Sequence, residues 1–89
     1  MNREREITVG VHCGVHGRVA AELARLVRTK KAGLEIITPE RSADCGSILE
    51  ILALGISRGS RIRVRANGPD AGSLLEQACS LLIGTGAGA

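Results

Sequence analysis

Three neighbouring residues, His16, Gly17 and Arg18, could together handle a phosphoryl group. They lie where a strand pattern gives way to a helix pattern, so the histidine is expected beside the free N–H groups of a first helical turn, which suit an anion. The imidazole supplies a nucleophile, the guanidinium suits phosphate oxygens, and the glycine leaves room for close approach. The segment therefore predicts phosphoryl transfer by positioning and charge stabilisation. The alternative is an ordinary histidine that caps a helix.

A metal site is another interpretation of this segment, because His12, Cys13 and His16 place three donors within five residues. Structural zinc sites usually have four ligands, and no second His/Cys pair has suitable spacing, so we expect no metal and no cofactor. The chain has three cysteines, an odd number, without C-x-x-C spacing. This favours reduced thiols in the cytoplasm over a disulfide framework, with Cys13 a small residue at a strand end.

The elements that must position His16 follow from the apolar periodicity. Alternation predicts strands at 7–11, 34–38, 41–44 and 61–66, and helical spacing predicts helices at 17–32, 48–54 and 71–82. Ser47 and Glu50 match a reciprocal capping box, and Asp70 can cap the last helix. The order β-α-β-β-α-β-α predicts an α+β domain, with three helices on one face of a four-stranded, mainly antiparallel sheet. We expect one domain at 1–84 and a flexible tail at 85–89.

Composition limits the classes of function. The 89 residues carry a net charge of +3 and contain no Phe, Tyr or Trp. No stretch approaches the roughly 20 apolar residues of a membrane span, and the charged N-terminus lacks a signal-peptide core, so we expect a cytoplasmic protein without membrane insertion. Arg61, Arg63 and Arg65 on an open sheet face could suggest nucleic-acid binding. Sheet-face RNA binders stack bases on aromatic side chains, so we expect no nucleic-acid partner.

Three segments resemble the signatures of HPr, the histidine-containing phosphocarrier of the sugar phosphotransferase system. The segment 14–21 is similar to the active-site motif G-[LIV]-H-A-R-P-A-A. The segment 46–55 is similar to the second signature, K-S-[IL]-x-x-[LIVM]-x-x-L-G, and 67–71 resembles the G-x-D-A turn before the last helix. The spacings also fit, so the resemblance covers nearly the whole chain. It implies the open-faced β-sandwich of that family.

The resemblance also implies roles for individual residues. His16 would accept a phosphoryl group from phosphorylated Enzyme I and pass it to a IIA domain, and Arg18 would steady the phosphate. Ser47 would match the serine that HPr kinase/phosphorylase modifies, although a capping serine is needed without any kinase. The chain would be a monomeric carrier, not a stand-alone catalyst. An apolar docking patch would be formed by Ile48, Leu49 and Leu52, for which core packing is the alternative.

Four positions depart from the family pattern. Val19 stands where the motif has proline. The valine restores a backbone N–H donor and makes the first helical turn less rigid. Gly17 replaces alanine, and Gly46 replaces a lysine near the docking surface. Glu50 stands where small residues are usual and would repel a phosphate on Ser47. These changes suggest a specialised member, so the alternative is a regulatory or nitrogen-type phosphotransferase module that acts by protein–protein binding.

Overall fold

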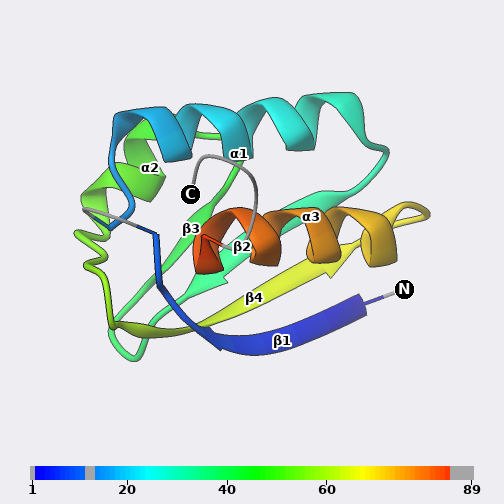
Figure 1. Cartoon of the computed structure of the whole chain (residues 1–89). Coiled ribbons are helices and arrows are strands. Elements are labelled where there is room, and N and C mark those ends of the chain that lie inside the picture. Colours follow the sequence, from blue (N-terminus) through cyan, green and yellow to red (C-terminus); the bar gives the residue numbers. More distant parts are fainter. Residues whose placement is uncertain (1, 12–13, 85–89) are drawn as a thin grey trace.

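The order of helices and strands is that predicted from the sequence (Figure 1). The computed structural model describes residues 2–11 and 14–84, so the predicted tail at 85–89 lies outside the described residues, as do His12 and Cys13. The elements are β1 (Asn2–Thr8), α1 (Gly17–Thr29), β2 (Gly33–Ile37), β3 (Ser42–Asp44), α2 (Ile48–Ala53), β4 (Arg61–Asn67) and α3 (Ala71–Ile83).

One antiparallel sheet carries the fold. Its strands lie in the order β1-β4-β2-β3. The three helices lie on the same side of it, and α3 packs on β1, β4 and β2 (Figure 1). In β4 every second residue is buried under α3, whereas Arg61, Arg63 and Arg65 face the uncovered side. The α+β open-faced sandwich predicted from the sequence is therefore confirmed.

The core between the two layers is built without aromatic rings. Its largest fully buried side chains are Leu23, Ile36, Ile51, Leu74, Leu82, Val9, Val64, Cys45 and Cys79. The apolar stripe of α3 is also buried; it consists of Ala71, Leu74, Leu75, Ala78 and Leu82. Burial raises the pKa of the Cys45 thiol to about 12, and the negative charges of Asp44 and Glu35 add to this effect. Both cysteines are free thiols, as the sequence indicated.

The first strand differs from its prediction at 7–11. It begins at Asn2, because residues 2–8 pair along the whole of β4. It ends at Thr8, because the backbone of Val9 bonds to the loop before β4: its N–H donates to the Ser60 carbonyl at 2.8 Å, and its carbonyl accepts from Gly59 at 2.7 Å. Residues 2–6 are all polar or charged, so apolar alternation does not indicate the start of this strand.

The first helix ends three residues before the predicted limit at 32. The Thr29 hydroxyl and the Lys30 N–H both donate to the Leu26 carbonyl, at 3.0 and 3.1 Å. Lys30 then has extended backbone angles (φ −113°, ψ 150°), which a helix cannot continue. Gly33, the residue after the predicted helix, begins β2.

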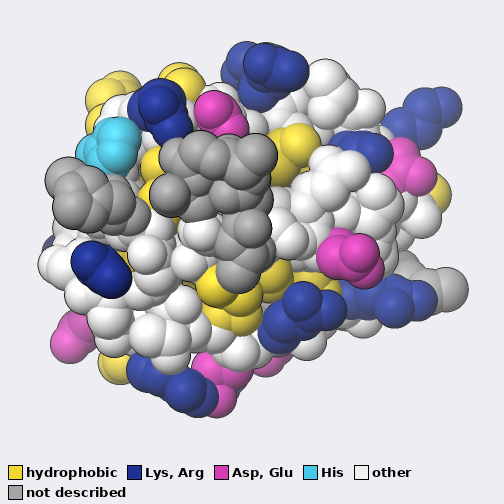
Figure 2. Space-filling model, viewed as in Figure 1, with side chains coloured by type: hydrophobic (Ala, Val, Ile, Leu, Met, Phe, Trp, Pro, Cys, Tyr) yellow, Lys and Arg dark blue, Asp and Glu magenta, His cyan; other side chains and the backbone are white. Residues whose placement is uncertain are grey.

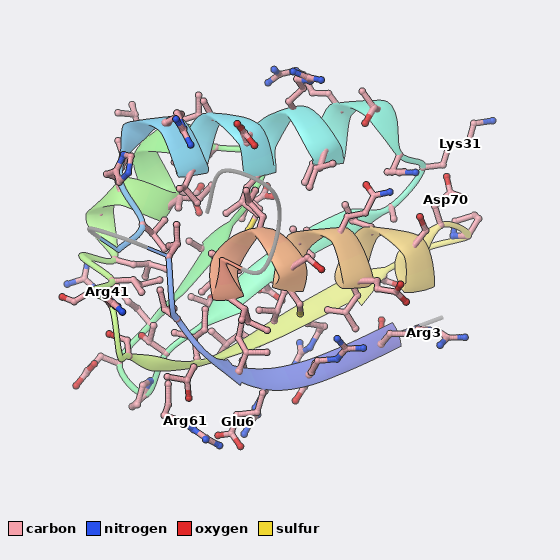
Figure 3. The ribbon with its side chains drawn as sticks, viewed as in Figure 1. Arg3, Glu6, Lys31, Arg41, Arg61 and Asp70 are labelled. Atoms are coloured by element: carbon pink, nitrogen blue, oxygen red, sulfur yellow. The ribbon has the colours of Figure 1, made fainter. Side chains whose placement is uncertain are left out.

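Two predicted helix caps differ in the structure, because the capping side chains bond to backbone groups outside their own helices. The Ser47 hydroxyl accepts from the Glu50 N–H at 3.3 Å, as predicted. The Glu50 carboxylate, however, accepts from the Asp44 N–H at 3.0 Å, so the reciprocal half of the capping box is wrong. The Asp70 carboxylate makes no cap either. It accepts from the Lys31 N–H at 2.9 Å and ties the turn after α1 to the turn before α3 (Figure 3).

Candidate functional site

His16 lies at the N-cap of α1 with its side chain exposed. Its backbone is extended (φ −114°, ψ −171°), and its carbonyl accepts the first helical bond, from the Ala20 N–H at 2.9 Å. The side chain makes no capping hydrogen bond. His16 is thus the residue that caps α1, as the alternative interpretation has it, but it does so through its backbone, and its ring makes no capping bond. Figure 2 shows the histidine side chain at the molecular surface, where a partner protein could reach it.

The N-terminal end of α1 suits an anion beside that ring. The N–H groups of Gly17, Arg18 and Val19 precede the first intrahelical donor, and the first turn contains no acidic residue. They lie at the positive end of the helix dipole. A side chain added at Gly17 would meet nothing within 4 Å, so this position has room for the alanine of the family motif. Arg18, the predicted cation, is the second residue of α1 and is exposed.

The loop that carries His16 is held by the segment that follows α2. The Gly14 N–H donates to the Val11 carbonyl at 3.0 Å, and the Val15 N–H donates to the Ile56 carbonyl at 3.1 Å. Gly14 has φ +72°, and a Cβ there would lie 2.7 Å from the Ile56 carbonyl oxygen. Only glycine combines a positive φ with the lack of a Cβ that this close contact requires. No local pattern in the sequence indicated the contribution of 56–58, because the contact joins segments about forty residues apart.

Val19, which replaces the motif's proline, anchors the helix by its side chain. It is 3% exposed and packs in the core with Val15 and Leu23. The helix still begins at Gly17 without the proline. The substitution thus leaves the turn formed and adds an N–H group to the donors at its start.

The three predicted docking residues are exposed on α2. Ile48 is 38% exposed, Leu49 79% and Leu52 39%, and these are the exposed large hydrophobic side chains among the described residues. The buried residue of this helix is Ile51. Helix α2 packs against α1, and Figure 1 places it beside the end of α1 at which His16 lies. The helix that carries the apolar patch therefore lies beside the start of α1, while the neighbouring Ser47 is half-buried and serves as the cap.

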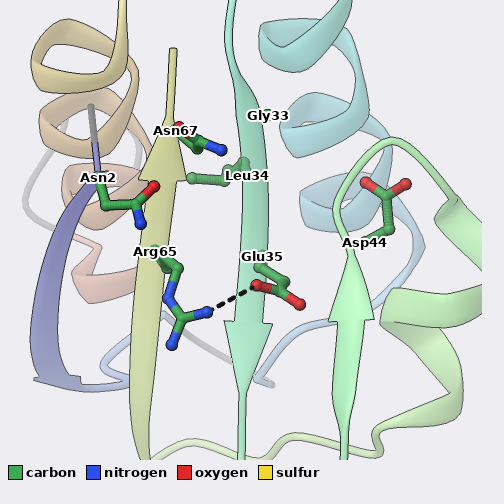
Figure 4. A pocket seen from close by; sticks show the side chains of 7 residues that line it. All are labelled: Asn2, Gly33, Leu34, Glu35, Asp44, Arg65 and Asn67. Atoms are coloured by element: carbon green, nitrogen blue, oxygen red, sulfur yellow. Dashed lines mark ion pairs between the residues drawn. The ribbon is translucent and has the colours of Figure 1, made fainter.

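The open face of the sheet is charge-balanced. Arg61 pairs with Glu6 at 2.9 Å (Figure 3), and Arg63 pairs with Glu4 at 3.1 Å. Arg65 lies 3.2 Å from Glu4 and 3.6 Å from Glu35. These pairs leave no basic stripe for a nucleic-acid backbone on this face. Figure 4 shows a shallow pocket at one end of the face, lined by Asn2, Gly33, Leu34, Glu35, Asp44, Arg65 and Asn67.

Residues 2–11 and 14–84 hold neither a metal-ligand cluster nor a membrane-spanning helix. No group of three or more His, Cys, Asp or Glu side chains in these ranges could hold a metal ion. The cluster considered from the sequence includes His12 and Cys13, which lie outside them. In the same ranges, no helix has the length and apolar character needed to cross a bilayer.

The sequence of this chain is similar to those of known phosphocarrier proteins. A family model described as the PTS HPr component phosphorylation site matches residues 3–83. The phosphocarrier protein NPr of Shewanella violacea is 33% identical over 79 residues, which cover 89% of this chain and 87% of that protein. The phosphocarrier protein HPr of Xylella fastidiosa is 33% identical over 67 residues, 75% of each chain.

A solved structure shows the same likeness in three dimensions. The crystal structure of a phosphocarrier protein HPr from Bacillus anthracis superimposes with a TM-score of 0.85 at 25% sequence identity. The match covers 91% of this chain and 96% of that one. The chain belongs to the HPr family of phosphocarriers of the phosphotransferase system.

Proposed function

We propose that this chain carries a phosphoryl group on His16, which it accepts from phosphorylated Enzyme I and passes to a IIA domain. The observation that carries the proposal is the exposed His16 side chain at the start of α1, beside the N–H groups that precede the first helical bond. Membership of the HPr family supports it. The chain would act as a phosphorylated intermediate between two proteins.

The proposed transfer uses the residues at the start of α1. A ring nitrogen of His16 forms a bond to phosphorus as the bond from phosphorus to the donor breaks. The charge on the phosphoryl oxygens is then met by the N–H groups of Gly17, Arg18 and Val19 and by the Arg18 guanidinium. Because these donors already have helical geometry, little reorganisation accompanies the transfer. The return step, onto the acceptor protein, uses the same contacts in reverse.

The exposed side chains of α2 would dock both partners. Ile48, Leu49 and Leu52 provide an apolar area next to the acceptor histidine. Burying such a patch favours association, and its position would direct a partner's reactive group toward His16.

We also propose Ser47 as a site for a regulatory kinase such as HPr kinase/phosphorylase. The Ser47 oxygen accepts a hydrogen bond from the Glu50 N–H at 3.3 Å, and a phosphate on it would lie at the start of α2.

Intact-mass measurement tests the carrier proposal. The native chain and a His16→Ala variant are incubated with Enzyme I and phosphoenolpyruvate. We expect one added phosphate on the native chain, lost in acid, and none on the variant. His16 is exposed, so the substitution should leave the fold intact, and circular dichroism of both proteins checks this. Absence of phosphate on a folded native chain, with an active control carrier in the same mixture, would contradict the proposal.

A nitrogen-type phosphotransferase role is the second candidate. The similarity to a protein named NPr favours it, as does Gly46 in place of the signature's lysine beside Ser47. Transfer rates from a sugar-type and a nitrogen-type Enzyme I to this chain distinguish the two. Faster phosphorylation by the nitrogen-type donor supports this candidate, and faster phosphorylation by the sugar-type donor rejects it.

A further inference from the structure

Arg58 is brought to the site by the fold, although the sequence motifs do not include it. It lies in the segment after α2 on which the loop before His16 rests. A Cβ at Gly14 would lie 3.0 Å from the Ser57 Cα and 3.1 Å from the Arg58 nitrogen. Gly14 and His16 are two residues apart, so their Cα atoms are at most about 7 Å apart. The backbone of Arg58 is therefore fixed within reach of the acceptor histidine for a long side chain.

The Arg58 side chain is also available for an anion. It is exposed, and no ion pair joins it to another described residue. The arginines of the nearby strand β4 differ, because each of them pairs with a glutamate. Neither of the two segments that meet here, 10–21 and 51–60, contains an aspartate or a glutamate. A dianion on His16 would thus face Arg18 from the helix and Arg58 from the loop.

The position of Arg58 is set by several backbone bonds. The Gly59 N–H donates to the Val9 carbonyl at 2.7 Å, and the Ser57 N–H donates to the Ser60 hydroxyl at 3.2 Å. Together with the bond from Val15 to Ile56, these contacts join the loop to both ends of the segment that leads to His16. Because this backbone is already fixed, only the side chain loses conformational freedom when the guanidinium binds an oxyanion.

We infer that Arg58 is the second cation of the phosphoryl site and that its guanidinium binds the phosphoryl oxygens on His16. The inference rests on the proposed carrier function. Arg18 and Arg58 would then hold the group from two sides, with the N–H groups of α1 as the third contact. Arginine is suited to this role because its planar fork donates two parallel hydrogen bonds to phosphate.

Phosphoramidate tests the inference without a protein partner. Its phosphorus–nitrogen bond breaks as phosphorus bonds to the His16 ring, and ammonia leaves with the ring proton. We expect Arg58→Gln to lower this rate about fivefold at low salt, as for loss of an exposed charge-assisted contact. The difference should shrink at high salt. Arg58→Lys should keep at least about half of the native rate, because it retains the charge.

The matched control is Arg61→Gln, which removes the same charge from an exposed arginine on the open face of the sheet. It should stay within about twofold of the native rate. If Arg58→Gln and Arg61→Gln slow the reaction equally, the loss of net charge alone explains the effect. That result would overturn the inference. An unchanged rate in Arg58→Gln would overturn it too. Slowing with Enzyme I but not with phosphoramidate would assign Arg58 to partner docking instead, and would also overturn it.

The carrier proposal fails in a different measurement. It fails when the native chain takes no phosphate from phosphorylated Enzyme I. That result is independent of how the Arg58 variants react with phosphoramidate.

Discussion

At the scale of single residues, two glycines near His16 have opposite requirements. Gly14 has a positive φ and lies against the backbone of the Ile56–Arg58 segment, so a side chain there is excluded. Gly17 has open space around its missing Cβ and no positive φ. The family motif has alanine at the position of Gly17. The sequence therefore identified both residues as part of the motif, but only the structure separates the required glycine from the replaceable one.

Stability measurements on two alanine variants check this distinction. Gly14→Ala should lower the free energy of unfolding by about 1–3 kcal/mol, since it forces a strained backbone and a close contact. Gly17→Ala should leave it unchanged or raise it by up to about 1 kcal/mol, because alanine favours the helix. Urea unfolding of the native chain and both variants gives these values. Equal destabilisation by the two substitutions would refute the assignment.

At the scale of elements, the short helix α2 combines a buried anchor with an exposed apolar surface. Ile51 is fully buried, and Leu49 is 79% exposed. The Ser47 hydroxyl and the Glu50 carboxylate fix the start of the helix by bonds to the Glu50 and Asp44 N–H groups. The helix is thus held firmly while its outer side chains remain in water. An exposed leucine beside a candidate acceptor suggests a role in binding a partner.

Leu49→Gln tests that role. Because the side chain is exposed, the change in unfolding free energy should be within about 0.5 kcal/mol. Phosphorylation by Enzyme I should show a raised KM, since an apolar docking contact is lost. Phosphorylation of the same variant by phosphoramidate should be unchanged, and this measurement is the control. A native KM for Enzyme I would exclude Leu49 from the docking surface.

At the scale of the whole molecule, an aromatic-free core encloses two free thiols between the helices and the sheet. The Cys45 thiol has a pKa of about 12, against an ordinary value of 9.0. Burial likewise raises the pKa of Cys79, an effect that the positive charge of Arg5 opposes. Both thiols are therefore protonated in the folded chain at neutral pH. At Cys45 the packing role requires this, because a buried thiolate there would be desolvated beside the negative charges of Asp44 and Glu35.

The Cys45 thiol predicts a loss of stability in alkali. A raised folded-state pKa gives stabilisation that is complete below about pH 9 and is lost as the pH rises towards 12. Within this window the unfolded thiol has lost a proton that the folded thiol keeps, so this group should lower the unfolding free energy by about 1.4 kcal/mol per pH unit. Denaturant unfolding between about pH 8 and about pH 11 measures the slope.

A Cys45→Ala variant provides the comparison for this slope. Its unfolding free energy should be lower at neutral pH, because the core loses a packed group. Its decline above pH 9 should be shallower than that of the native chain, because one of the titrating thiols is gone. Parallel declines in the two proteins would show that Cys45 does not control the alkaline limit.

The sequence by itself determined the order of the elements, the two-layer fold and the segment that carries His16. These follow from local regularities: the alternation in β4, the apolar stripe of α3 and the compact motif around the histidine. Such patterns involve residues close in the chain, so their physical meaning does not depend on the rest of the molecule.

Only the tertiary structure decided which partners meet across the chain. The Asp70 carboxylate bonds to Lys31, and the charged residues of β1 pair with the arginines of β4. Gly14 lies against the backbone of the segment that contains Arg58. Each contact joins residues far apart in sequence, and each depends on the strand order β1-β4-β2-β3. A polar side chain can satisfy a nearby backbone group or a distant one, and the packing of the layers selects between them.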